Sequence, residues 1–213
     1  IEGLSIKAGS TLTSARAGLV GVIYNGNLKN VHLRNSKISG TGYVGGLAGE
    51  VHRATIQECS VADTVIDDGT GASPARIGGL AGFMQVLKVE RSYTRNVDIQ
   101  VLNSPVVEGV GGLIGFNGQV TIENCYAHGT IQVNGGKVGG ICGAMNESWS
   151  RTNHVWADVD ITATGNQVGG FAGWSTGRHL GGITFGNIFT TGDKAQRMNG
   201  EVNSTNITGR YMN

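Results

Sequence analysis

The chain alternates short apolar stretches with polar and glycine-rich stretches along its whole length. The apolar stretches last four to six residues and are bounded by Gly, Asn, Asp, Ser and Thr. β-Strands show this pattern, whereas amphipathic helices repeat apolar residues at i, i+3 and i+4 over ten or more positions. The pattern therefore predicts an all-β chain.

A glycine block recurs with a period of about thirty residues. Each copy holds two glycines, an aliphatic or aromatic residue, one variable residue and a third glycine. The copies occupy 45–49, 78–82, 111–115, 139–143 and 169–173, and a variant at 17–21 begins with alanine. The second glycine falls at 18, 46, 79, 112, 140 and 170, so the steps are 28, 33, 33, 28 and 30. A fixed period of this size is typical of repeat architectures.

A second apolar block follows each glycine block at a nearly constant offset. One of its columns reads Leu4, Val31, Cys59, Ser92, Cys125, Val155 and Ile188. Each repeat offers three short strands, which cannot bury a face alone, so each strand is expected to stack on its counterpart in the next coil. We therefore predict a parallel three-sided β-solenoid of about seven coils over residues 1–192. Residues 193–213 are expected to form a cap or an exit to a following domain.

The repeat also predicts which side chains fill the bore. One inward stack comes from the glycine blocks and comprises Leu19, Leu47, Leu80, Leu113, Ile141 and Phe171. A second comes from the following block and comprises Leu4, Val31, Cys59, Cys125, Val155 and Ile188. The paired glycines are expected to supply either positive φ at a corner or room for close backbone approach.

Composition and charge exclude several classes of protein. Of the 213 residues, 37 are glycine, but only two are proline and 39% are hydrophobic, which excludes collagen and a disordered glycine-rich chain. With 16 basic and 15 acidic residues, the chain has no charge excess that would attract nucleic acid. No apolar run is long enough to span a membrane. The chain opens at Ile1, and we expect it to be a piece of a longer protein.

The three cysteines are predicted to be free, buried thiols. Cys59 and Cys125 share a repeat column but lie two coils apart, about 9.6 Å at the usual strand spacing. A disulfide needs Cα atoms within about 7 Å. Cys142 lies at a different corner, and no C-x-x-C or histidine pairing suggests a metal site. We therefore expect no cofactor.

No catalytic motif emerges from the sequence. H-E-x-x-H and G-x-S-x-G are absent, and residues 109–115 miss G-x-G-x-x-G by one position. Solenoids that cleave polysaccharides need acidic residues at one phase of adjacent coils. Asp98 and Asp160 lie 19 and 20 residues after their markers, but the coil between them has Ile131 and Gln132 there. We therefore predict no catalytic or metal-binding residues, and polysaccharide cleavage is kept as an alternative.

Aromatic residues follow the second core column on consecutive coils. Tyr93, Tyr126, Trp156 and Phe189 share this phase and form a candidate interaction strip. The alternative interpretation is that β-propensity alone favours aromatic residues beside a core column.

The repeat resembles a known family. Residues 110–115, Val-Gly-Gly-Leu-Ile-Gly, and 122–127, Ile-Glu-Asn-Cys-Tyr-Ala, are similar to the GLUG repeat, and the likeness extends over nearly residues 1–190. GLUG repeats occur in bacterial cell-surface proteins, among them the immunoglobulin A protease family of streptococcal zinc metallopeptidases, where they resemble a region upstream of a separate catalytic domain. The zinc-binding H-E-x-x-H of that family has no counterpart here, so no catalytic residue is carried over.

The resemblance implies a function outside catalysis. It implies a non-catalytic scaffold or substrate-contacting domain of a secreted zinc metalloprotease, extracellular or attached to the cell wall of a Gram-positive bacterium. The expected partners are a host glycoprotein such as an immunoglobulin and the rest of the parent chain, with no nucleic acid and no membrane span. The alternative is a free-standing surface adhesin or structural repeat protein that binds host protein or glycan.

Overall fold

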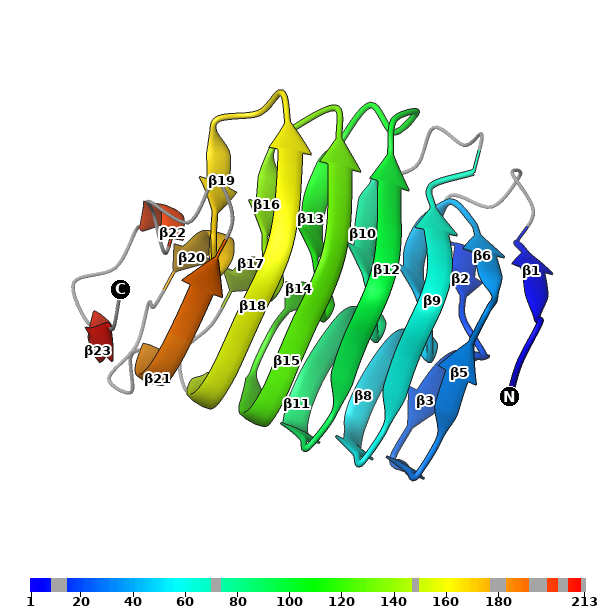
Figure 1. Ribbon diagram of the computed structural model, residues 1–213, viewed down its shortest axis with the longest axis horizontal. Coiled ribbons are helices and arrows are strands. Elements are labelled where there is room, and N and C mark those ends of the chain that lie inside the picture. The colour runs from blue at the N-terminus through cyan, green and yellow to red at the C-terminus, as the bar shows by residue number, and fades with distance from the viewer. Residues whose placement is uncertain are drawn as a thin grey trace.

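The chain folds as a stack of parallel β-strands that wind around a common axis (Figure 1). The computed structural model describes residues 1–8, 15–69, 74–146, 150–176, 183–191, 199–202 and 207–211. These residues contain no helix, and every pairing between their named strands is parallel. The prediction of an all-β parallel solenoid is confirmed.

The number of coils differs from the prediction. The described residues make about five turns rather than about seven. The larger number came from counting one column from Leu4 to Ile188. In the first rung (one coil of the solenoid), which contains Leu4, the described residues 1–8 contribute a single named strand, β1 (Ser5–Lys7), which pairs with β6 (Lys37–Ser39). A column position therefore does not guarantee a three-sided turn.

The strands form three faces. We call them faces one, two and three in the order in which each full turn passes through them, starting from β2. Face one holds β2 (Ala15–Ala17), β7 (Gly42–Gly45), β10 (Ala75–Gly78), β13 (Val107–Gly111), β16 (Lys137–Gly139) and β19 (Gln167–Gly169). Face two holds β3 (Val20–Tyr24), β4 (Asn27–Lys29), β8 (Ala48–Gln57), β11 (Ala81–Glu90), β14 (Ile114–Asn117), β17 (Cys142–Asn146), β20 (Ala172–Thr176) and β22 (Asn199–Val202). Face three holds β1, β6, β5 (His32–Arg34), β9 (Ser60–Asp67) and β12 (Tyr93–Val101). Three long strands turn from face two onto face three: β15 (Val120–Val133), β18 (Arg151–Ala163) and β21 (Ile183–Thr191), on which β23 (Ile207–Tyr211) pairs.

Backbone hydrogen bonds connect equivalent residues of successive rungs. The N–H of Leu47 donates to the carbonyl of Leu80 at 3.0 Å, and the N–H of Leu80 donates to that of Leu113 at 2.8 Å. The same connection continues through Ile141 to Phe171, at 3.0 Å in each step. Residues 28 to 33 positions apart therefore lie directly above one another.

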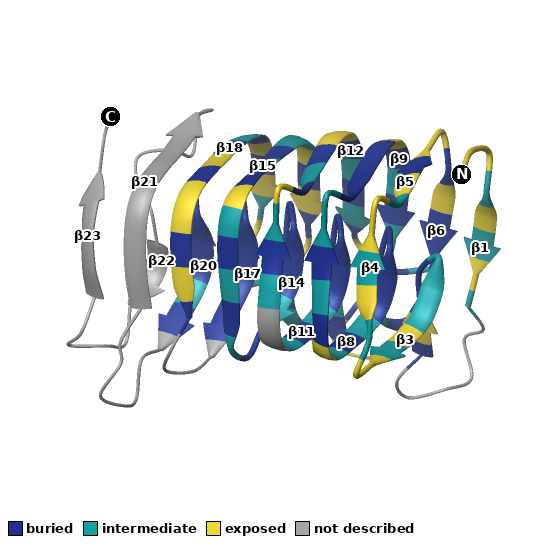
Figure 2. Ribbon diagram, turned by 90° about the horizontal axis from the view of Figure 1, so that it is seen from below, coloured by how far each residue is buried: buried dark blue, intermediate teal, exposed yellow. Residues whose placement is uncertain are grey.

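The bore is filled by apolar side chains from all three faces. Figure 2 marks the buried residues along the described strands. Leu47, Leu80, Leu113, Ile141 and Phe171 are fully buried. The N-terminal rung is less enclosed, since Leu4, Leu19 and Val31 are only partly buried. Cys59, Cys125 and Val155 are also buried, whereas the side chain of Ile188 lies outside the described residues.

The paired glycines allow the rungs to approach each other closely. None of the described glycines at 45–46, 78–79, 111–112 and 139–140 has positive φ. A Cβ added to Gly46 would lie 2.5 Å from the carbonyl oxygen of Gly79, and one added to Gly79 would overlap that of Gly112. Of the two roles expected for these glycines, the structure shows close backbone approach.

Positive φ at the corner between faces two and three is adopted by residues other than glycine. In the column that precedes the second core stack, φ lies between 45° and 59° at Asn30, Glu58, Arg91, Asn124 and His154, and Gly3 of the same column has φ 69°. Asparagine tolerates this left-handed conformation better than most residues. A second such column on face three comprises Asn35, Asp63 and Asn96.

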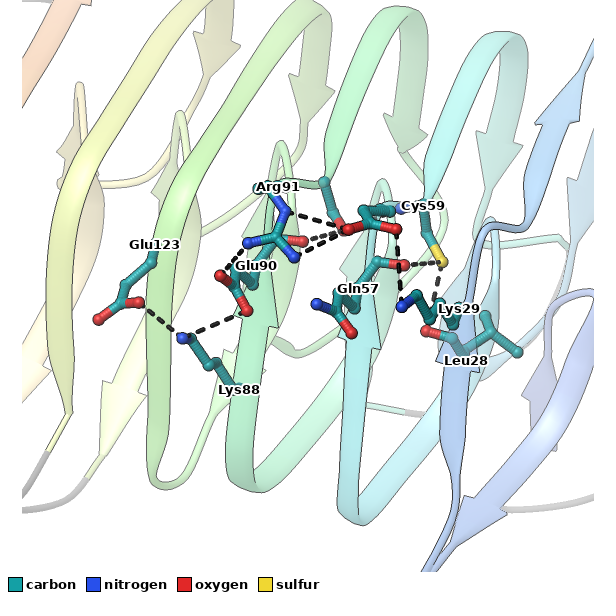
Figure 3. A network of polar contacts seen from close by, with 10 residues as sticks. Leu28, Lys29, Gln57, Cys59, Lys88, Glu90, Arg91 and Glu123 are labelled. Atoms are coloured by element: carbon teal, nitrogen blue, oxygen red, sulfur yellow. Dashed lines mark hydrogen bonds and ion pairs between the residues drawn. The ribbon is translucent and has the colours of Figure 1, made fainter.

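Alternating charges line the same corner (Figure 3). Arg91 donates to Glu58 at 2.8 Å, and the Lys88 ammonium lies 2.7 Å from Glu123 and 3.3 Å from Glu90. The hydrogen bond from Arg91 contributes most to a lowered pKa of the Glu58 carboxyl. These groups are all in part accessible to solvent, so each pair adds little to stability.

The three cysteines are free and buried, as predicted. Burial raises the pKa of the Cys125 thiol to about 12 and also raises that of Cys142. Of the predicted cap, 193–213, the structure describes only β22 and β23, and the remaining residues of that segment lie outside the described part. In the described residues there is no helix that is long and apolar enough to cross a bilayer.

Candidate interaction surface

The outward side of face three carries the predicted aromatic strip. Tyr93 pairs in register with Tyr126, and Tyr126 with Trp156. The two tyrosine rings are nearly parallel, with centroids 4.7 Å apart and planes 5° apart. The Trp156 ring follows at 5.9 Å from Tyr126 and is tilted by 42°. Phe189 continues the backbone register, but its side chain lies outside the described residues.

Stacking determines which parts of the strip a partner can reach. Because Tyr93 and Tyr126 face each other, they present ring edges to solvent, and the faces between them are covered. Burial raises the pKa of Tyr126, and the neighbouring Tyr93 adds to the effect. Trp156, by contrast, is 40% exposed. Of the three strip side chains that the structure describes, the indole is therefore the most accessible to a partner.

A hollow of about 450 Å³ lies on the same face, and its lining includes Asp158, two positions after Trp156 on β18. It is lined by Asn96, Val97, Asp98, His128, Gly129, Thr130, Asp158 and Asp160. Trp156, Asp158 and Asp160 alternate with buried residues along β18, so their side chains share the outer side of the strand. The indole and the hollow therefore form one continuous surface, which we call the β12–β18 surface.

Hydrogen bonds hold the polar groups of the hollow in place. Thr130 Oγ1 donates to Asp98 Oδ1 at 2.7 Å, and Gln100 Nε2 donates to Asp98 Oδ2 at 2.6 Å. The backbone N–H of Asn96 donates to His128 Nδ1 at 3.2 Å, which leaves the proton of the neutral imidazole on Nε2. Both oxygens of Asp98 therefore accept a hydrogen bond from a neighbouring uncharged side chain.

A β-bulge determines which side chains meet in the hollow. Thr94 pairs with Ala127 and Val97 with Gly129, so two residues of β12 oppose the single residue His128. The shift aligns Asp98 with Thr130 and Asp160, and not with the positions Ile131 or Gln132 that the sequence indicated. Asn96, at φ 52°, lies in the bulged stretch of β12, and Gly129 of the partner strand, at φ 148°, follows directly where the register resumes. An isolated glycine in a strand is the sequence signal that could have revealed the bulge.

The hollow does not have the geometry of a metal centre. Asp98 and Asp160 are two rungs apart, about 9.6 Å, with Thr130 between them. Within the described ranges, no group of three or more His, Cys, Asp and Glu side chains could hold a metal ion.

A second group of aromatic and charged residues lies on the ridge between faces one and two, and the sequence analysis did not anticipate it. The Arg76 guanidinium lies 4.3 Å from the centroid of Phe116, 4.8 Å from Tyr43 and 4.9 Å from Phe83. Its Nε contacts Glu108 at 2.5 Å. The guanidinium is thereby enclosed by side chains of neighbouring rungs, so this group joins rungs and leaves little surface for a ligand.

A glutamate–histidine pair extends that ridge. Glu50 lies 2.5 Å from Arg16 and 2.6 Å from His52. Partial burial alone would raise the pKa of Glu50, but the hydrogen bonds from His52 and Arg16 outweigh it, and the pKa lies below its usual value. The carboxylate is thus stabilised as an anion within the ridge.

Comparison with known families gives one match. Residues 107–132 are similar to the family described as "The GLUG motif". The chain carries a GLUG repeat. The matched segment runs from the start of β13 to Gln132, the second-last residue of β15. It therefore includes the glycine block 111–115 together with Tyr126, His128 and Thr130. The search of curated proteins found no match.

Proposed function

We propose that this chain is a non-catalytic GLUG-repeat scaffold that presents the β12–β18 surface to a protein partner. The observation that carries the proposal is the 40% exposed Trp156 beside a 450 Å³ hollow. The neighbouring tyrosines are stacked and the core is closed, so this indole stands out among the side chains of face three. Exposed tryptophans next to polar pockets are frequent centres of protein interfaces.

The proposal extends to the parent protein. We infer an accessory domain of a secreted or wall-attached zinc metalloprotease of a Gram-positive bacterium, similar to the immunoglobulin A protease family, in which zinc belongs to a separate domain. The GLUG match at 107–132 supports the repeat part of this inference. The protease part rests on the resemblance of the repeat. A host glycoprotein such as an immunoglobulin is the partner that follows from it.

The binding part is tested with immobilised immunoglobulin A and surface plasmon resonance. Trp156→Ala should weaken binding at least tenfold, because it removes the exposed indole. Trp174→Ala is the matched control, since Trp174 lies on face two against Lys137. Equal losses in the two variants, or no binding by the unaltered chain, would contradict the proposal.

The parent assignment is tested by sequencing the gene on either side of the region that encodes this chain. An H-E-x-x-H motif downstream is the expected result. Further repeats that lead to a wall anchor, without such a motif, would favour a free-standing adhesin and contradict the protease assignment.

A further inference from the structure

Asparagine followed directly by glycine occurs at four places along the chain. Such a pair is chemically reactive, because the backbone nitrogen of the glycine can attack the side-chain carbonyl of the asparagine, and glycine has no Cβ to hinder the attack. The four pairs are Asn25–Gly26, Asn117–Gly118, Asn134–Gly135 and Asn199–Gly200. The dipeptides are identical, so their surroundings in the fold determine which of them reacts.

The fold protects the pair at Asn117. The Asn117 side chain is fully buried, and the N–H of Gly118 donates to the carbonyl of Met84 at 2.8 Å. A nitrogen that is held by a hydrogen bond to the preceding rung is not free to attack the side chain before it. The closely packed interior also excludes the water that the reaction consumes.

The pair at Asn134 is restrained by a different contact. Asn134 is exposed, but its Nδ2 donates to the carbonyl of Leu102 at 3.1 Å. Its backbone N–H also donates to the carbonyl of Val101, at 2.9 Å. Both bonds hold the residue against the preceding rung, so its side chain has to break a contact before it can react. The side chain of Asn199 lies outside the described residues.

Asn25–Gly26 has neither form of protection. The pair lies between β3 and β4, and Asn25 is exposed. Among the residues that the structure describes, the N–H of Gly26 has no acceptor and the side-chain amide of Asn25 has no hydrogen-bond partner. The attacking nitrogen and the carbon it attacks are therefore both free and accessible to water.

We propose that Asn25–Gly26 is a site of spontaneous deamidation and isomerisation. The Gly26 nitrogen forms a bond to Cγ of Asn25, the bond between Cγ and Nδ2 breaks, and the amide group leaves as ammonia with the proton that the Gly26 nitrogen loses. This step closes a succinimide ring. Water then adds to either ring carbonyl and opens the ring, which gives aspartate or isoaspartate. Over both steps one water is consumed and one ammonia is released, without oxidation or reduction.

The isoaspartate product changes the pairing of β3 and β4 with β8. Two backbone hydrogen bonds flank the site: the N–H of Asn25 donates to the carbonyl of His52 at 3.0 Å, and the N–H of Thr55 donates to the carbonyl of Gly26 at 3.2 Å. In isoaspartate the main chain runs through the side-chain carbon, so one additional carbon lies between these two bonds. The two bonds can then no longer form together in their present register. The modification therefore loosens the contact between two successive rungs.

The test follows the unaltered chain at pH 8 and 37 °C, both native and in urea, by tandem mass spectrometry of proteolytic fragments. In the native protein, Asn25 should convert at least tenfold faster than Asn117. In urea the two should convert at rates within threefold of each other, because the fold no longer protects Asn117. Asn30 is the internal control, since it is exposed and has φ 59° against 54° for Asn25, but precedes Val31. Asn30 should convert at least tenfold more slowly than Asn25.

Gly26→Ala tests the chemical route. A Cβ at Gly26 would lie 3.5 Å from Ile23 Cγ2, which is an ordinary contact, and Gly26 does not have positive φ, so the fold should be kept. The methyl group hinders the attack, so conversion of Asn25 should slow at least tenfold, while that of Asn134 should stay within twofold. Hydrogen exchange measures the structural effect: the N–H of Thr55 should exchange faster in the isoaspartyl protein than in the fresh protein.

The proposed site would be overturned by equal conversion of Asn25 and Asn117 in the native protein, or by conversion of Asn25 no faster than that of Asn30. Conversion of Asn25 in Gly26→Ala at the rate of the unaltered chain would overturn the succinimide route. Unchanged exchange at Thr55 in the isoaspartyl protein would contradict the loss of pairing with β8.

Discussion

Asn117 is a polar residue in the middle of the apolar bore. Its side chain is fully buried, and neither its amide nitrogen nor its oxygen has a hydrogen-bond partner. It lies in register between Met84 and Met145, so the equivalent positions on both neighbouring rungs are apolar. A buried group without a partner costs about 1–3 kcal/mol. The site is therefore a weak point of the fold.

Replacing this side chain should stabilise the protein. We expect Asn117→Leu to raise the free energy of unfolding by about 1–2 kcal/mol, because it removes an unsatisfied amide from an apolar column. Urea denaturation measures the change. Thr94→Val is the contrasting variant and should lose about 1 kcal/mol, since the Thr94 hydroxyl donates to the carbonyl of Gly112 at 3.1 Å. A loss of stability in Asn117→Leu would show that Asn117 is satisfied in solution.

The buried thiols give a prediction about pH. The pKa of Cys125 is raised to about 12, against about 8.5 for an unperturbed thiol. Its contribution to stability is therefore complete below about pH 8.5 and is lost as the pH rises toward 12. At pH 8, a thiol reagent should label the native protein only as fast as it unfolds, and should label three thiols in denaturant. Immediate labelling of Cys125 or Cys142 in the native protein would contradict their burial.

At the scale of the element, each turn of the solenoid depends on two different backbone features. The glycine blocks bring backbones into close contact, whereas the corner between faces two and three uses left-handed residues such as Asn30 and Asn124. The two features differ in which side chains they accept. A glycine at a close approach accepts no Cβ, whereas a left-handed corner accepts side chains at an energetic cost.

Gly79→Ala tests the close approach. The new Cβ would overlap the carbonyl oxygen of Gly112 and lie 2.5 Å from Thr94 Cγ2, so we expect a loss of about 3 kcal/mol or more. Gly136→Ala is the matched control, because the nearest atom to its new Cβ would be the Val107 oxygen at 4.0 Å. The control should change the free energy of unfolding by no more than about 0.5 kcal/mol. Similar values for both variants would mean that the rungs are not packed as described.

The sequence predicted the stacking of elements well but not their fine register. The recurrence of Leu47, Leu80 and Leu113 identifies the solenoid, because only equivalent positions of successive coils are under the same constraint. The alignment of Asp98 with Thr130 was missed, since one bulge opposite His128 shifts the pairing by a residue. Contacts around Arg76 were missed because its ring partners come from other rungs.

At the scale of the whole molecule, an outward-facing position that recurs in each coil forms an extended surface along the solenoid. Each outward position becomes a column along the axis, because successive strands lie side by side in parallel (Figure 1). The aromatic strip and the hollow both extend over several rungs of face three. A ligand that follows the axis can meet several rungs at once. The proposed binding function therefore depends on the rungs being in register from β12 to β18.

An engineered disulfide tests this register most directly. Gln132 and Thr162 are exposed, 30 positions apart, and paired across β15 and β18. Their Cα atoms should be about 4.8 Å apart, within the range for a disulfide. Asn124, only eight positions from Gln132, lies at the corner of β15; the straight stretch that follows it separates the two residues by roughly 20 Å, far beyond the range for a disulfide.

Under mild oxidation of the native protein, the account predicts that Gln132→Cys with Thr162→Cys forms the cross-link nearly completely. It predicts that Gln132→Cys with Asn124→Cys forms none within one molecule. Mass spectrometry of proteolytic fragments measures both. The stacked solenoid would be contradicted if Gln132→Cys with Thr162→Cys failed to form the cross-link. It would also be contradicted if Gln132→Cys with Asn124→Cys formed one within a molecule.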